Sequence, residues 1–333
     1  MNFSVKVKAA LVILSVSLLT ASAAYARWQR IAGSQEPSTL KVSVNLVSLH
    51  VTVTDAKGHM GSGLQTEDFK IYEDGVEQST TFFSTDEAPV TWALALDRSG
   101  SMFEMIKDVY QAALHVMDEG TNADEMSIIT FNHEIELVSD FTSDRRRLEN
   151  AIVDLRATGQ TALYDAIDLA LEHIREGRRR KKVLVVVTDG EDNFSHIEFD
   201  RLVELVERNR DVVIYPVGMF EPGFWWERKR ISPKIVSKLR TIAETTGASA
   251  HFPKNIKECR QAMTDIAREV SQHYSLGYYP SNRALDGKWR RIRVEIVPRA
   301  GKDRKYFART RAGYYATDAE LDSNAHRVPG GPQ

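Results

Sequence analysis

The stretch VTWALALDRSGSM (90–102) sets the organisation of the chain. An unbroken apolar run ends in the carboxylate of Asp97, and a tight turn with two hydroxyls, Ser99 and Ser101, follows it. Unbroken apolar strands are typical of parallel sheets that are buried on both faces. Ligands of such sheets bind at the carboxyl ends of the strands, where Asp97 lies. The stretch therefore predicts both a fold and the position of a site.

The same pattern recurs further along the chain. Apolar strand-like runs follow at MSIITF, KKVLVVVTD, DVVIYPVG and ASAHFP, and amphipathic segments separate them. Between Ser101 and Glu119, apolar residues recur at spacings of four, three and four, which is a helical period. Strands that alternate with helices predict an α/β domain over residues 90–272, with a doubly wound, mostly parallel sheet flanked by helices.

The two flanks of this domain carry a different pattern. Residues 38–88 and 273–316 show period-2 runs broken by turns, which indicate short antiparallel strands. Neither set is large enough to be stable alone, so each needs a partner. We expect both flanks to join in one small β-sandwich that carries the α/β domain as an insertion. The alternative is two separate β extensions packed on the α/β core.

The ends of the chain predict export and a disordered tail. Residues 1–26 combine two lysines, an apolar run of roughly a dozen residues and the segment TASAAYA, as in a cleaved secretory signal peptide. We expect the protein in a periplasm, on a cell surface or secreted, with no transmembrane domain after cleavage. An uncleaved anchor is the alternative, although a spanning helix needs about 20 apolar residues. Residues 317–333 have the composition of a disordered segment.

Composition and missing motifs exclude several functions. The chain of 333 residues has 44 Lys and Arg against 46 Asp and Glu, so we expect no nucleic-acid partner. Cys259 is the sole cysteine, which excludes an intrachain disulfide and predicts a buried apolar residue. No phosphate-binding glycine loop is present, and the turn at Ser99 lacks the first glycine of a G-x-S-x-G nucleophile motif.

A second carboxylate occupies the matching end of another strand. The run KKVLVVVTD ends in Asp189, and TGQTALYDAI places Thr161 just before a predicted helix. Carboxylates and hydroxyls are hard oxygen ligands, which suit Mg²⁺ or a similar cation. The predicted ligands are Asp97, Ser99, Ser101, Thr161 and Asp189. For Ser101 the alternative role is a helix N-cap.

These elements resemble, in order and spacing, the metal-ion-dependent adhesion site of von Willebrand factor A domains, which have a Rossmann-like fold. The resemblance extends over about 90–272, and the flanks look like those of bacterial secreted relatives. It implies a protein-binding module and not an enzyme. Asp97, Ser99 and Ser101 would hold Mg²⁺, or Mn²⁺ or Ca²⁺, with Thr161 and Asp189 bound directly or through water. A protein partner would present a carboxylate to the ion.

Two further features are predicted to contact the partner. Arg98 stands where the resembled family often has a small residue. The loop MFEPGFWWERKRISP leaves the sheet at the same edge, and its rings would form an apolar rim; they are Phe224, Trp225 and Trp226. The alternative for these rings is to cover the domain's own helices. The competing functions are a metal-dependent hydrolase and a structural secreted protein whose metal only stabilises loops.

Overall fold

The computed structural model describes residues 46–85, 88–121, 123–219, 232–297 and 305–317. The predicted signal peptide, almost all of the predicted disordered tail and the three rings at 224–226 lie outside these residues. Among the described residues, no helix has the length and apolar character needed to cross a bilayer.

A five-stranded sheet forms the centre of the α/β part. Its order is β7 (Ile135–Thr142), β6 (Glu125–Phe131), β5 (Val90–Asp97), β8 (Lys181–Thr188) and β9 (Val212–Gly218). Four of these strands run parallel, and β7 joins the edge antiparallel. Every residue of β5 and β6 is buried, as an unbroken apolar run requires. The predicted fold class is confirmed.

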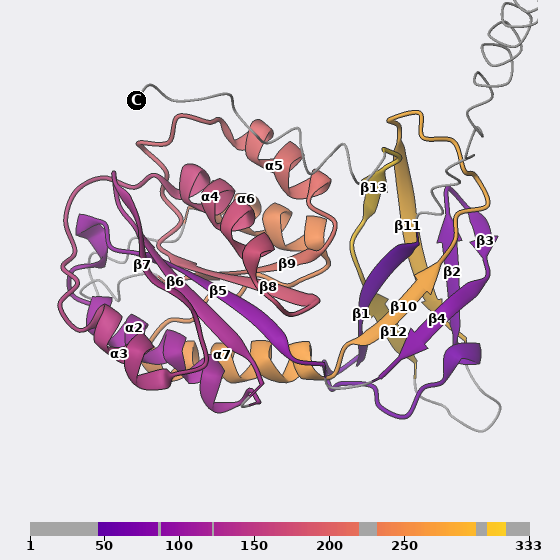
Figure 1. Cartoon of the computed structure of the whole chain (residues 1–333), viewed down its shortest axis with the longest axis horizontal. Coiled ribbons are helices and arrows are strands. Elements are labelled where there is room, and N and C mark those ends of the chain that lie inside the picture. Colours follow the sequence, from indigo (N-terminus) through magenta and orange to yellow (C-terminus); the bar gives the residue numbers. More distant parts are fainter. Residues whose placement is uncertain (1–45, 86–87, 122, 220–231, 298–304, 318–333) are drawn as a thin grey trace, which may run out of the picture. The chain divides into compact units, whose positions relative to one another are not determined.

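Helices cover both faces of this sheet (Figure 1). One face carries α2 (Ile106–Leu114), α3 (Arg145–Ile152) and α7 (Ile256–Ser271); the other carries α4 (Leu163–His173), α5 (Phe199–Arg208) and α6 (Pro233–Thr246). Alternate residues of β5 point to opposite faces of the sheet. Trp92 packs in the apolar core with α2, α3 and α7, whereas Ala93 packs in the core with α4, α5 and α6. The two apolar cores therefore fix the sheet from both sides.

Two details of the sequence prediction were wrong. The run ASAHFP forms no strand, because His251 makes only an isolated bridge with Val217 before Pro253 removes a backbone donor. The predicted helix after Ser101 is divided into η2 (Gly100–Met102), α2 and η3 (His115–Asp118). Strand β7 was not anticipated, because all of its residues are partly or fully exposed and give no apolar run.

The flanking segments form two four-stranded antiparallel sheets. The first has the order β12 (Tyr306–Arg309), β1 (Val47–Asp55), β10 (Tyr274–Tyr278) and β4 (Thr80–Ser84). The second has the order β13 (Gly313–Tyr315), β11 (Trp289–Ile296), β2 (Phe69–Glu73) and β3 (Val76–Gln78). Strand β1 pairs with β10 and β12, and β2 pairs with β11. The two flanks thus pair with each other in both sheets and share one apolar core, as expected of a sandwich.

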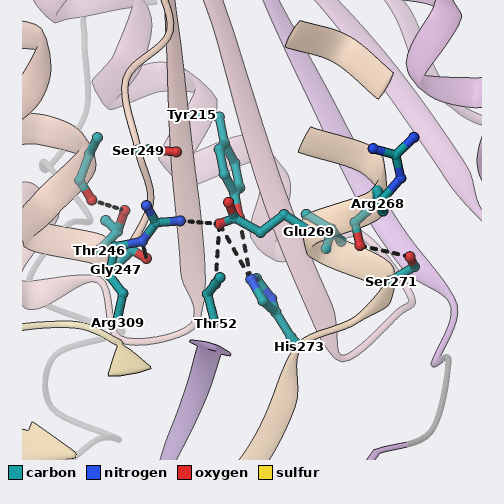
Figure 2. A network of polar contacts seen from close by, with 12 residues as sticks. Thr52, Tyr215, Thr246, Gly247, Ser249, Arg268, Glu269, Ser271, His273 and Arg309 are labelled. Atoms are coloured by element: carbon teal, nitrogen blue, oxygen red, sulfur yellow. Dashed lines mark hydrogen bonds and ion pairs between the residues drawn. The ribbon is translucent and has the colours of Figure 1, made fainter. Parts of the chain in front are cut away.

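A largely buried carboxylate, that of Glu269, connects the sandwich strands to the α/β part (Figure 2). Glu269, near the end of α7, accepts hydrogen bonds from Thr52 of β1 at 3.1 Å and from Tyr215 of β9 at 2.7 Å. It also pairs with Arg309 of β12 and lies 3.7 Å from the ring of His273. Burial raises the pKa of Glu269, but the hydrogen bond with His273 and the charge of Arg309 outweigh it and lower the pKa to about 2. Glu269 is therefore an anion that joins four elements.

Candidate metal site

Asp97 is the last residue of β5 and is fully buried. Its Oδ1 accepts from the backbone N–H of Ser99 at 2.8 Å, and its Oδ2 accepts from the Thr188 hydroxyl at 2.6 Å. Burial and then the charge of Asp189 raise the pKa of Asp97 to about 6, although hydrogen bonds from Ser99 and Thr188 act against them. The two carboxylates are thus close enough to repel each other, and a cation near both would remove that repulsion.

The turn after Asp97 presents its two hydroxyls together. Ser99 Oγ lies 3.1 Å from Ser101 Oγ, and the Ser99 side chain is buried. The N-cap of η2 is Ser99, and its side chain makes no capping hydrogen bond. Ser101 lies inside η2 and does not occupy the cap position proposed as its alternative. Neither serine is therefore explained by helix capping of η2.

Backbone hydrogen bonds hold the Thr161 loop against this turn. The N–H of Thr158 donates to the Arg98 carbonyl at 2.8 Å, and the N–H of Gly100 donates to the Gly159 carbonyl at 3.0 Å. Gly159 has a φ of 78°, and a Cβ there would lie 2.2 Å from Nδ1 of His133. The positive φ favours glycine at this position, and a larger residue would also have to displace the exposed side chain of His133.

The loop after β8 closes the site from the other side. Asp189 follows β8 directly, and its Oδ1 accepts from the N–H of Glu191 at 3.1 Å. Thr161 is buried, and its N–H donates to the Asn193 side chain at 2.9 Å. The Thr161 carbonyl accepts from the N–H groups of Asn193 and Phe194, both at 3.0 Å. The five predicted ligands therefore come from three loops that are bonded together at one edge of the sheet.

The donor set fits a hard divalent cation. It offers two carboxylates, whose charges balance the ion, and three neutral hydroxyls. Within the described ranges, no three His, Cys, Asp or Glu side chains are grouped as a metal site. A cation at this edge would therefore depend on the hydroxyl oxygens as well as the acids. The charge of Asp189 raises the pKa of Asp97, and a cation held near both carboxylates would act in the opposite direction.

Two exposed rings at this edge were not anticipated from the sequence. Phe103 follows Ser101 by two residues and is 71% exposed; Phe194 is 43% exposed. The ring of Phe194 contacts His133 edge to face, with centroids 5.9 Å apart. The sequence did hold one sign of these exposed rings: each is a large apolar residue within a polar turn that also carries a predicted metal ligand. These rings lie on the ligand-bearing loops themselves.

Arg98 is placed beside acidic side chains of the neighbouring hairpin. Its guanidinium lies 3.8 Å from Glu134 and 3.8 Å from Glu136, and the side chain is 13% exposed. The backbone carbonyl of Arg98 accepts the hydrogen bond from Thr158 in the Thr161 loop. A direct contact between Arg98 and a partner stays a prediction, as do the contacts of residues 224–226.

Comparisons with known proteins were made for the whole chain. Residues 93–191 match the family model described as von Willebrand factor type A domain, which supports a domain of this type in that part of the chain. An uncharacterised protein of Synechocystis sp. is 26% identical over 189 residues, which are 55% of this chain. The chain spans 42% of the length of that relative.

The solved structures that match this chain have low sequence identity to it. A von Willebrand factor type A structure from Catenulispora acidiphila is 12% identical and matches 87% of this chain and 78% of its own, with a TM-score of 0.47. The conserved hypothetical protein BatB from Bacteroides thetaiotaomicron is 18% identical, with coverages of 55% and 97% and a TM-score of 0.45. The type V pili tip protein Mfa5 from Porphyromonas gingivalis is 11% identical, with coverages of 55% and 95% and a TM-score of 0.45.

Proposed function

We propose that this chain is an exported, cation-dependent protein-binding module rather than an enzyme. The ion is Mg²⁺, with Mn²⁺ or Ca²⁺ as substitutes, and its ligands are Asp97, Ser99, Ser101, Thr161 and Asp189. When bound, the ion supplies an electrophilic coordination position for a carboxylate oxygen of the partner. One observation supports this most directly: the buried Asp97 carboxylate is fixed at both oxygens beside the paired hydroxyls of Ser99 and Ser101, at the sheet edge where Asp189 follows the neighbouring strand.

The protein's own residues would determine how strongly the partner is held. Three of the five ligands are neutral hydroxyls, so the two carboxylates only balance a divalent ion, and a vacant coordination position can accept a carboxylate oxygen of the partner without excess negative charge from the protein. Around it, Phe103 and Phe194 expose apolar rings, and Glu104 and Glu191 expose carboxylates. We therefore infer a partner segment with one acidic side chain flanked by apolar or basic residues. Additional acids on that segment would be repelled by the rim.

Metal binding is the first step to test. Titration of the full chain with Mn²⁺, followed by electron paramagnetic resonance, should show one bound ion per chain. Asp97→Asn removes one ligand charge at nearly constant volume and should weaken binding at least tenfold. Glu191→Gln is the matched control, because Glu191 is an exposed acid of the same edge and is not a predicted ligand. Equal Mn²⁺ affinity in the wild type and in Asp97→Asn would overturn the ligand assignment.

Partner binding separates the competing functions. Capture of a protein from the exported fraction should be abolished by EDTA, restored by Mg²⁺ and absent with Asp97→Asn. Turnover of ester or phosphate substrates that depends on Asp97 would instead support a metal-dependent hydrolase. An ion that raises the melting temperature, without any chelator-sensitive partner, would support a purely structural metal.

Export is tested separately. Expression of the full chain, fractionation and N-terminal sequencing should give a mature protein that begins after Ala23 or Ala26. An intact N-terminus in the membrane fraction would favour the uncleaved anchor. This outcome would leave the metal site unaffected.

A further inference from the structure

A small cavity lies between β1, the connection from α5 to β9 and the segment that joins β12 to β13. Seven of its nine lining residues are polar, and Val212 and Val213 add apolar surface; the polar ones include Ser48, His50, Asn209, Arg210, Thr310 and Arg311. Its volume of about 10 Å³ has room for roughly one water-sized sphere. The cavity is remote in sequence from the loops of the metal site.

Three buried polar atoms at this cavity lack a partner. Nδ1 of His50, Nδ2 of Asn209 and Oγ1 of Thr310 make no hydrogen bond with any described residue. A buried polar group left unpaired destabilises the folded state, so a ligand that accepts from these atoms would be favoured. Burial, followed by the charges of His273 and Lys181, lowers the pKa of His50 to about 3, so its ring is neutral near pH 7. A neutral imidazole, an amide nitrogen and a hydroxyl can each donate into the cavity.

The surroundings of these donors are electropositive. Arg311 is 7% exposed, and its three guanidinium nitrogens donate to backbone carbonyls of Gly313, Arg210 and Glu207. Burial and then the charge of Arg210 lower the pKa of Arg311 to about 10, although the acids Asp211 and Glu207 act in the opposite direction. Among the described residues, no carboxylate forms an ion pair with Arg311, and none lines the cavity. The buried cation therefore lacks a direct counter-charge.

We propose that this cavity binds one small monovalent anion, such as chloride. An anion accepts from all three unpaired donors, whereas a water molecule must also place its own two hydrogens. The anion also supplies the counter-charge that Arg311 lacks. The small volume excludes gluconate and similar organic anions. Binding would join β1 of the sandwich to Asn209 and to Thr310, so the occupied state is more stable than the unoccupied one.

Chloride-dependent unfolding tests this proposal. The full chain, kept in EDTA to remove any contribution of divalent metal, is melted in mixtures of sodium chloride and sodium gluconate at constant ionic strength. Above the dissociation constant, each tenfold rise in chloride should raise the melting temperature by about 2 °C. Equal melting temperatures across the series would overturn the proposal and assign the cavity to water.

Variants locate the effect. Thr310→Val removes one donor at constant volume and should abolish most of the chloride-dependent rise. Thr241→Val is the matched control, because its exposed hydroxyl donates only within α6, and it should retain the full rise. If Thr310→Val does not fold, bromide soaked into wild-type crystals provides the second measurement, through anomalous diffraction between residues 50, 209 and 310. Anomalous density elsewhere only, or an unchanged rise in Thr310→Val, would refute the site.

Discussion

Replacement of Glu269 by glutamine tests whether a single charge stabilises the contact between the sandwich strands and the α/β part. The amide keeps the size of the side chain and an oxygen that accepts from Thr52 and Tyr215. It removes only the negative charge that faces Arg309 and His273. The effect of Glu269→Gln is therefore mainly electrostatic, and it can be worked out from the pKa of the carboxyl.

The magnitude follows from linkage. The pKa of Glu269 falls from its ordinary value of 4.5 to about 2 in the folded protein. Each unit corresponds to about 1.4 kcal/mol, so the charge contributes about 3 kcal/mol at neutral pH. A lowered carboxyl pKa stabilises the fold above the unfolded-state value, and this contribution is lost as pH falls through the folded-state value. At pH 3.5 it should be about 2 kcal/mol, and near pH 2 it should be almost gone.

Chemical denaturation of the wild type and of Glu269→Gln between pH 3.5 and pH 7 provides the measurement. Asp265→Asn is the matched control on the same helix, because Asp265 is about half exposed and pairs only on the surface. It should change the unfolding free energy by no more than about 0.5 kcal/mol. A cost of Glu269→Gln equal to that of the control, or one that does not shrink towards acid pH, would refute the electrostatic role.

Three further predictions concern single positions. Gly247→Ala should lower the melting temperature, because φ is 85° and the new Cβ would lie 2.5 Å from the carbonyl carbon of Thr310; a stable variant would contradict this packing. Cys259 is fully buried, and burial raises its pKa to about 12, so a thiol reagent should label it only in denaturant. Thr188→Val should cost about 1–3 kcal/mol in EDTA, since Asp97 loses a buried donor; no loss in chemical denaturation would argue against that hydrogen bond.

The sequence predicts the sheet and the candidate site for the same reason. A buried parallel strand needs an unbroken apolar run, so polar residues such as Asp97 and Asp189 stand out where each strand ends. The pairing of the two flanking β segments was predicted because neither segment has enough strands to be stable alone. What the sequence did not predict has weaker local signals: none of the residues of β7 is fully buried, and ASAHFP has strand composition but forms only one isolated bridge.

The contacts made by Glu269 could not be predicted from local patterns. Thr52 lies 217 residues before Glu269 in the chain, and Arg309 comes from a third segment. On a helix such as α7 an isolated glutamate is usually a solvated residue. The exposed rings at 103 and 194 were also missed, because exposure depends on how the loops fold. Sequence reasoning located the ligands but not the surface around them.

The insertion of the α/β part has a consequence for the order in which the chain folds during synthesis. Strand β1 pairs with β10, and the hydroxyl of Tyr314 bonds to Glu73, 241 residues earlier. Strand β2 can pair locally with β3, but β1 and the other edge of β2 must wait for partners until the C-terminal strands are available. During that time their open edges are available to strands of other chains, and such edges are prone to aggregation. A chain truncated before residue 274 would remain permanently in this aggregation-prone state.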